Sequence, residues 1–264
     1  MGDKKHPILV SIPHGSTFVP AELRRRMHMT DRGVKLQSDP YTVDIFDVPN
    51  AYVVKARISR LVVDLNRAPD DIEMELKLSA DGVVVSVDLD GKPIYKDPPS
   101  FEVIAERVNQ YHDMFHEKIE ELKPKIKFLI DGHSMRSKGP VTKADSGQER
   151  ADVVLGNRDY TTCSRKMTRK IMKFFEEKGF SVAINNPYKG RYIIGYHCSR
   201  RGLPGIQIEL NERLYMGEKT HKPHKKKIQK LNQIVAELVE VLHTALEKEE
   251  GLSRADLSAQ GSLF

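Results

Sequence analysis

The sequence contains no tryptophan, only two cysteines and no long apolar run. Two cysteines are too few for a disulfide framework or for a cysteine-based zinc site. No window approaches the roughly 18 consecutive apolar residues that a membrane-spanning helix requires. The apolar stretch near the N-terminus, residues 8–12, is interrupted by Pro13 and is shorter than the core of a signal peptide. We therefore expect a cytoplasmic protein without a membrane partner.

The charge balance is basic: 43 lysines and arginines stand against 37 aspartates and glutamates, a net charge of +6. A basic surface permits an anionic small substrate, nucleic acid or acidic lipid. The densest basic run, Lys219–Lys227, precedes a helical pattern, and acidic residues are interspersed elsewhere. We interpret this run as a solvated loop and helix start rather than a nucleic-acid-binding surface.

The length of 264 residues suits one α/β domain. Strand-like and helical patterns alternate, which predicts an α/β fold with a mixed, mainly parallel central sheet and helices on both faces. The catalytic domain is expected to span residues 1–250, and residues 251–264 a flexible C-terminal tail. The predicted strands are residues 8–12, 51–56, 61–65, 127–131, 180–184 and 205–210, and the predicted helices are residues 100–122, 164–178 and 225–249.

One segment between these elements predicts a hairpin. Residues 83–89 and 93–95 flank Asp90-Gly91, a dipeptide favoured in two-residue turns. The pattern assigns no functional role to the surrounding region, residues 70–97.

Polar clusters follow several predicted strands. His14 stands in a Pro-His-Gly turn, Asp64 precedes Asn66-Arg67, His133 follows Asp131-Gly132, and Glu209 lies inside the apolar run Gly205–Leu210. In open α/β sheets, ligands bind in the crevice beyond the carboxyl ends of the strands. Residues distant in sequence are therefore expected to converge there.

Two histidines at strand ends, with carboxylates nearby, are typical of a zinc site. A single His14 would more simply be a turn histidine bonded to backbone, but its pairing with His133 favours a metal site. No HExxH motif is present, so the ligands must come from separate loops. A carboxylate such as Glu209 is costly in an apolar strand unless it has a function or an ion-pair partner.

Six short motifs occur in order between about residue 8 and residue 216, nearly the whole predicted domain. The motifs are VSIPHG at 10–15, SDPY at 38–41, RLVVDLNR at 60–67, DGHS at 131–134, NPYKG at 186–190 and IQIELN at 206–211 with LYM at 214–216. Together they resemble the N-formylglutamate amidohydrolase family. The resemblance implies a phosphorylase/hydrolase-like fold similar to the zinc carboxypeptidases and aspartoacylase, with one zinc ion per chain.

Within this resemblance, His14 and His133 would be metal ligands. The carboxypeptidase relatives place a glutamate three residues after the first histidine, where this chain has Thr17, a poor zinc ligand. The third ligand must then come from elsewhere. Asp39 fits the family's acidic position, and Asp44 is the alternative.

The resemblance also implies the catalytic and substrate-binding residues. Glu209 would be the general base, accepting a proton from a metal-activated water, and Arg60 would stabilise the developing oxyanion. Asn66 and Arg67 would hold a substrate carboxylate, because a guanidinium binds a carboxylate through two hydrogen bonds. Asp64 would brace these arginines.

A second substrate-binding segment is the loop that contains Lys189 and Gly190. The family usually continues with another glycine, whereas this chain has Arg191, which would narrow the pocket or contact an acidic side chain. Tyr196 and His197 follow shortly and either line the same pocket or are structural.

The implied reaction is hydrolysis of an N-acyl amino acid, with N-formyl-L-glutamate as the first candidate, releasing formate and glutamate. Two alternatives remain open. One is a carboxypeptidase-like metallopeptidase or cell-wall amidase, which would need a longer groove. The other is a non-catalytic module that binds a polyanion through Lys219–Lys227.

Overall fold

A six-stranded sheet forms the centre of the computed structural model, which describes residues 5–72 and 81–261, with side chains as far as residue 249. The strand order is β2-β1-β3-β6-β4-β5. Neighbouring strands are parallel except for β4 and β6, which are antiparallel. The predicted mixed, mainly parallel sheet is confirmed. The strands are β1 (Ile8–Ile12), β2 (Tyr52–Lys55), β3 (Phe128–Met135), β4 (Val153–Gly156), β5 (Val182–Ile184) and β6 (Gly205–Asn211).

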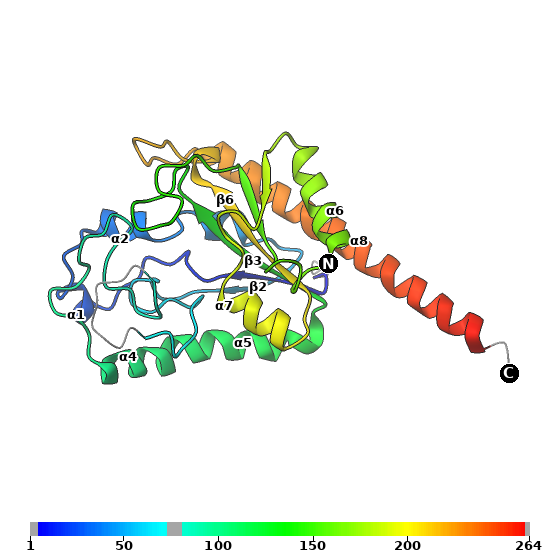
Figure 1. The fold of residues 1–264 in the computed structure, drawn as a ribbon, viewed down its shortest axis with the longest axis horizontal. Coiled ribbons are helices and arrows are strands. Elements are labelled where there is room, and N and C mark those ends of the chain that lie inside the picture. The colour runs from blue at the N-terminus through cyan, green and yellow to red at the C-terminus, as the bar shows by residue number, and fades with distance from the viewer. Residues whose placement is uncertain (1–4, 73–80, 262–264) are drawn as a thin grey trace.

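Helices cover both faces of this sheet, as predicted (Figure 1). Because successive side chains of a strand point to opposite faces, β1 contributes Val10 to one apolar core and Leu9 to the other. The first core contains α3, α6 and α8, and the second contains α4, α5 and α7. The helical segments are α1 (Ala21–Arg24), α2 (Asp31–Gln37), α3 (Thr42–Phe46), α4 (Phe101–Arg107), η1 (Val108–Asp113), α5 (Met114–Leu122), η2 (Lys123–Lys125), α6 (Arg165–Glu176), α7 (Tyr192–Ile194), η3 (Gly195–Arg200), η4 (Glu212–Leu214) and α8 (Lys225–Gly261).

Two helix starts follow the capping chemistry of the sequence. The Ser100 hydroxyl accepts a hydrogen bond from the Val103 amide, and the Ser164 hydroxyl accepts one from the Met167 amide, which satisfies a free N–H group in each first turn. The predicted helix at 100–122 is continuous but passes through the π-helical segment η1. That segment widens the helix at the turn that carries His112.

The strand predicted at residues 61–65 is wrong. The segment is buried, but several of its carbonyl groups accept hydrogen bonds from side chains instead of from a neighbouring strand. Tyr95 donates to the Leu61 carbonyl, and Arg107 donates to the Val62 carbonyl over 3.2 Å. Buried side-chain donors thus satisfy a backbone that the apolar pattern assigned to the sheet.

The predicted hairpin at residues 83–95 is reduced to one isolated antiparallel bridge, between Val87 and Pro93. The Asp88 carboxylate accepts from the amides of Asp90 and Lys92 at 2.9 Å, so a side chain organises this turn. Part of the wider 70–97 region, residues 73–80, lies outside the described residues.

The last helix, α8, continues to Gly261, past its predicted end at residue 249. In Figure 1 its C-terminal half, in red, projects beyond the sheet. The flexibility of residues 251–264 stays a prediction. Lys219–Lys227 forms an exposed loop and the first turn of α8. None of the helices in the described part of the chain is long and apolar enough to cross a membrane.

Strand order places the site. The chain leaves β1 for β2 on one side, and β3 lies on the other side of β1, so the carboxyl ends of β1 and β3 border a topological switch point. β6 is the next strand, and Glu209 stands opposite His133 in its register.

Candidate metal centre

His14, Asp39 and His133 converge at this switch point. All three are buried, and one ligand atom from each lies within 4.8 Å of the others. Asp39 Oδ2 is 3.0 Å from His133 Nδ1 and 3.6 Å from His14 Nδ1. The Nδ1 atom of His14 is buried without a hydrogen-bond partner among the described residues. A buried polar atom of this kind is costly, so the group is suited to hold a metal ion.

A carboxylate holds the far side of each histidine. His14 Nε2 lies 2.7 Å from Asp64, and His133 Nε2 lies 2.9 Å from Asp131. Asp131 also accepts a hydrogen bond from the Ser11 hydroxyl over 2.6 Å. A carboxylate on one ring nitrogen fixes the tautomer and leaves the other nitrogen available to a metal, which is the usual arrangement around metal-binding histidines.

The local backbone allows this convergence. At Gly132, between Asp131 and His133, an added Cβ would lie 2.7 Å from the ring of Phe46, so only glycine lets α3 pack against β3 here. Asp39 follows α2, and its carboxylate accepts from the Ser134 amide over 3.2 Å. Asp44, the alternative third ligand, is exposed on α3. The geometry therefore favours Asp39.

Glu209 lies beside this group on β6. Its carboxylate accepts a hydrogen bond from Gln207 over 2.8 Å, and within the described part of the chain it forms no ion pair. Burial and the nearby carboxylates of Asp39 and Asp131 raise the pKa of Glu209 to about 8, although His133 acts in the opposite direction. A structural ion pair therefore does not explain this buried carboxylate, and it can carry a proton near neutral pH.

Arg60 connects the metal group to the carboxylates behind it. Its guanidinium donates to Asp64 over 2.6 Å and lies 4.0 Å from Asp39. Burial alone would raise the pKa of Asp64, but Arg60 and His14 together hold it well below its ordinary value. Asp64 thus braces Arg60, as the resemblance implies, and also orients His14.

The metal group opens into a small cavity of about 70 Å³. Its wall is strongly cationic, which favours an anionic ligand. The carboxylates of Glu209 and Glu212 also border it, and burial raises the pKa of Glu212 to about 7. The cationic side chains of the wall are Arg60, Arg67, Arg136, Lys143, Arg150 and Arg191.

Three of these cations, Arg136, Lys143 and Arg150, were not predicted. They come from the loop between β3 and β4, which carries no motif of its own. Their position in the sequence could have indicated their role. Basic residues that follow the strand bearing His133 can reach the same edge of the sheet as His133.

One protein carboxylate already lies among these cations. Asp81 accepts from Arg67 over 2.8 Å and from Lys143 over 2.9 and 3.0 Å, and it lies 3.8 Å from Arg191. Together, hydrogen bonding and charge from Lys143 and Arg67 outweigh burial and lower the pKa of Asp81 to about 2. This part of the cavity can bind a carboxylate.

The remaining predicted contacts differ in their placement. Asn66 lines the cavity and donates to Asp131 over 3.3 Å, and its Nδ2 atom lies 3.1 Å from His133 Nε2. Lys189 points away from the cavity and pairs with Asp159 over 2.9 Å at the surface. Gly190 has a φ of 98°, and an added Cβ would lie 2.0 Å from Ile194, so it shapes the loop. The geometry gives neither Lys189 nor Gly190 a direct substrate contact.

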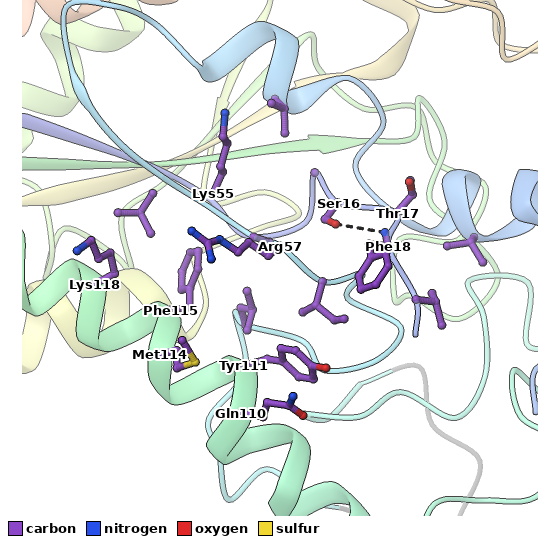
Figure 2. A pocket seen from close by; sticks show the side chains of 18 of the residues that line it. Ser16, Thr17, Phe18, Lys55, Arg57, Gln110, Tyr111, Met114, Phe115 and Lys118 are labelled. Atoms are coloured by element: carbon purple, nitrogen blue, oxygen red, sulfur yellow. Dashed lines mark hydrogen bonds between the residues drawn. The ribbon is translucent and has the colours of Figure 1, made fainter. Parts of the chain in front are cut away.

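A larger hollow lies elsewhere in the described part of the chain. Its volume is about 1350 Å³, and Figure 2 shows it between the helical segments η1 and α5, which carry Tyr111 and Met114, and the loop of Ser16–Phe18. Thr17 lines this hollow and not the metal cavity, in agreement with its not being a ligand. No metal-ligand cluster borders the hollow within the described residues. The chemistry therefore identifies the smaller cavity as the candidate site.

Comparisons with known proteins point to one family. A family model described as N-formylglutamate amidohydrolase matches residues 6–216. An N-formylglutamate deformylase of Pseudomonas aeruginosa is 28% identical over 229 residues, covering 80% of this chain and 83% of the relative. The enzyme of the same name from Pseudomonas putida is 25% identical over 225 residues, covering 80% of this chain and 82% of the relative.

Two solved structures share the fold. The crystal structure of N-formylglutamate amidohydrolase from Ralstonia eutropha JMP134 superposes with a TM-score of 0.76 at 24% identity, over 92% of this chain and 96% of that one. A gene product of Agrobacterium tumefaciens gives a TM-score of 0.67 at 17% identity, over 94% of this chain and 93% of that one.

Proposed function

The chain belongs to the N-formylglutamate amidohydrolase family, and on this premise we propose that it hydrolyses N-formyl-L-glutamate to formate and glutamate. The observation that carries the proposal is the convergence of His14, Asp39 and His133 in a cationic cavity that Glu209 also borders. The apolar cores on the two faces of one sheet support a single catalytic domain over residues 1–250.

We propose that one zinc ion per chain is held by the Nδ1 atoms of His14 and His133 and by the Asp39 carboxylate. This set fits zinc, which favours imidazole nitrogen and carboxylate oxygen. The unpartnered Nδ1 of His14 supports the same assignment. When bound, such an ion polarises a carbonyl group and lowers the pKa of a water molecule.

The protein's own groups then account for the proton transfers. Glu209 accepts a proton from the attacking water and donates it to the leaving amine, for which its raised pKa is suited. Arg60 donates hydrogen bonds to the oxyanion that develops on the acyl carbon, and Asp64 holds its guanidinium in place.

The cationic wall accounts for the choice of an acidic substrate. N-formyl-L-glutamate carries two carboxylates, and Arg67, Lys143 and Arg191 already surround the carboxylate of Asp81. We propose that a substrate carboxylate binds to these three cations and displaces the carboxylate of Asp81 from them.

The Asp81→Asn variant tests this competition. Removing the charge of Asp81 frees Arg67 and Lys143 for the substrate. The KM for N-formyl-L-glutamate is therefore expected to fall about threefold to tenfold, which corresponds to the free energy of a partly exposed ion pair. The kcat is expected to stay nearly unchanged. Steady-state kinetics measure both constants, and Asp159→Asn, which removes an exposed carboxylate paired with Lys189 outside the cavity, is the control. An unchanged or higher KM in Asp81→Asn would contradict the competition.

The Asp131→Asn variant tests the support of His133. Loss of the carboxylate that holds Nε2 is expected to weaken zinc affinity about 10- to 100-fold, because it no longer fixes the tautomer that presents Nδ1. Competition with a fluorescent chelator measures the affinity. An Asp152→Asn variant, which alters a carboxylate that pairs with Arg213 outside the cavity, should retain the affinity of the wild type. Equal affinities for all three proteins would show that Asp131 does not support a metal ligand.

The competing functions have less support. A peptidase or cell-wall amidase needs a long groove, whereas the metal group opens into a cavity of about 70 Å³ with several cationic side chains in its lining. A polyanion-binding module would act through Lys219–Lys227, which lies apart from the buried metal group.

The function is tested by assaying zinc-loaded protein on N-formyl-L-glutamate, N-acetyl-L-glutamate and N-formyl-L-glutamine. Release of formate from the first substrate, with lower kcat/KM for the other two, is expected, because the second enlarges the acyl group and the third lacks the distal carboxylate. Zinc-loaded protein that releases no amine from any member of the panel would overturn the proposal.

A further inference from the structure

Three buried histidines behind the cavity have no place in the reaction described above. His116 lies on α5, whereas His112 and His197 lie on the π-helical segments η1 and η3. The rings of His116 and His197 stack with centroids 5.1 Å apart. π-helical segments are rare and occur frequently at functional sites. Two of them here bring imidazole rings together in the core.

Two of these histidines, His116 and His112, contact the backbone of the segment that carries Arg67, one of the cavity arginines. His116 Nε2 lies 3.0 Å from the carbonyl oxygen of Leu65, and His112 Nε2 lies 2.9 Å from that of Arg67. Carbonyl oxygens only accept hydrogen bonds, so both nitrogens carry a proton. The two bonds bracket Asn66, whose side chain reaches His133.

A line of hydrogen bonds, which we call the histidine relay, extends from one of these contacts to the surface. It runs from the Leu65 carbonyl through His116 and His197 to Glu120. His116 Nδ1 is 2.9 Å from His197 Nε2, and His197 Nδ1 is 2.9 Å from Glu120. His197 is fully buried, whereas the Glu120 side chain is 35% exposed. The relay thus joins a solvent-accessible carboxylate to the Leu65 carbonyl.

The relay needs one more hydrogen than two neutral imidazoles supply. It contains three hydrogen bonds, and each neutral ring has only one N–H group. The third hydrogen must be a proton shared by His197 and Glu120. Without it, at least one bond is lost, and a change of tautomer can transfer that loss to the Leu65 carbonyl.

The surroundings set the direction of this dependence. Burial lowers the pKa of His197, with Lys123 acting in the same sense and Glu120 and Asp131 opposing it. The shared proton is therefore present at low pH and leaves as the pH rises. The other groups that face the relay are His112 on η1, Tyr192 on α7 and Tyr196 on η3.

We propose that the histidine relay, together with His112, is a protonation-dependent positioning device that holds residues 65–67 so that Asn66 and Arg67 fit the substrate. It rests on the proposed deformylase function. His112, His116 and His197 are positioning residues, because they act through the backbone and do not border the cavity. The consequence is a substrate affinity that depends on the charge of a group outside the cavity.

The positioning role is tested by paired substitutions of His116. His116→Leu removes both hydrogen bonds, whereas His116→Gln retains a donor for the Leu65 carbonyl and an acceptor for His197. We expect His116→Leu to raise the KM about tenfold, the effect of leaving a buried carbonyl unsatisfied, with zinc content unchanged. His116→Gln should recover most of that loss. If the two variants have the same KM, the hydrogen bonds do not position the segment.

The shared proton is tested with Glu120→Gln. The amide of glutamine supplies the third hydrogen permanently, so the relay no longer depends on pH. The ratio of wild-type KM to Glu120→Gln KM is expected to be near one at low pH and to rise several-fold as the pH increases, on the order of one lost hydrogen bond. Glu121→Gln, on the same helix, should give a constant ratio. A constant ratio for Glu120→Gln would overturn the proton dependence.

Nitrogen-15 NMR of the histidine rings separates failure of the relay from failure of the proposed function. The relay predicts that His116 Nε2 stays protonated at every pH in Glu120→Gln and changes its protonation with pH in the wild type. This result, in a protein that releases no formate, would refute the deformylase function alone. A His116 signal that is the same in both proteins would refute the relay whatever the activity.

Discussion

Replacing Glu209 with glutamine is expected to lower kcat about 100- to 10,000-fold while the zinc ion stays bound. Glutamine keeps the size and the hydrogen bond of Glu209 but cannot accept a proton from water. The carboxylate is not among the metal ligands that the geometry favours, so its loss leaves the metal group intact. Formate release and metal analysis on the same preparation measure both quantities.

Glu212→Gln is the matched control for this experiment. Glu212 borders the same cavity, and burial also raises its pKa, to about 7, so it is the other carboxylate able to carry a proton there. Its substitution is expected to have a much smaller effect on kcat than that of Glu209. If Glu212→Gln loses more activity than Glu209→Gln, then Glu212 is the general base and the assignment above is wrong.

Replacing His133 with alanine should remove both the metal and the activity. Loss of one of three protein ligands, with the Asp131 carboxylate left unpaired behind it, is expected to reduce zinc from about one ion per chain to near zero after dialysis. Metal analysis measures this directly.

His28→Ala, which removes an exposed histidine, controls for the general effect of losing an imidazole. It should retain zinc and activity equal to those of the wild type. Stoichiometric zinc in His133→Ala would contradict the proposed ligand set, even if the activity were lost.

The sequence predicted that His14, His133 and Glu209 converge because parallel strands simplify the geometry. His14, His133 and Glu209 belong to β1, β3 and β6 or to the turn after them, and neighbouring parallel strands place such residues at one edge. Asp39 required the family resemblance, since a carboxylate before a proline in a loop is otherwise ordinary.

The supporting residues were harder to predict because they depend on how side chains pair across the core. Asp131 precedes His133 by two residues, so both side chains lie on the same face of β3 and can meet. The pattern alone did not show that Asp131 holds His133, or that Asp64 holds His14 as well as Arg60. The histidine relay was missed because its residues lie on two separate helical segments whose contact depends on tertiary packing.

The errors in the fold have a similar origin. Residues 61–65 have the composition of a buried strand, and they are buried, but Tyr95 and Arg107 satisfy their backbone from elsewhere in the chain. A hydrophobic sequence pattern indicates that a segment is buried. It does not show whether a neighbouring strand has a free edge with which the segment can pair.

The most direct test of the proposed metal centre is anomalous diffraction from crystals of zinc-loaded protein, recorded on both sides of the zinc absorption edge. We expect one strong peak within bonding distance of His14 Nδ1, His133 Nδ1 and the Asp39 carboxylate, with Glu209 beside it but outside the ligand set. A peak at any other group of residues, or no peak in crystals of a protein that releases formate, would contradict the proposed metal centre.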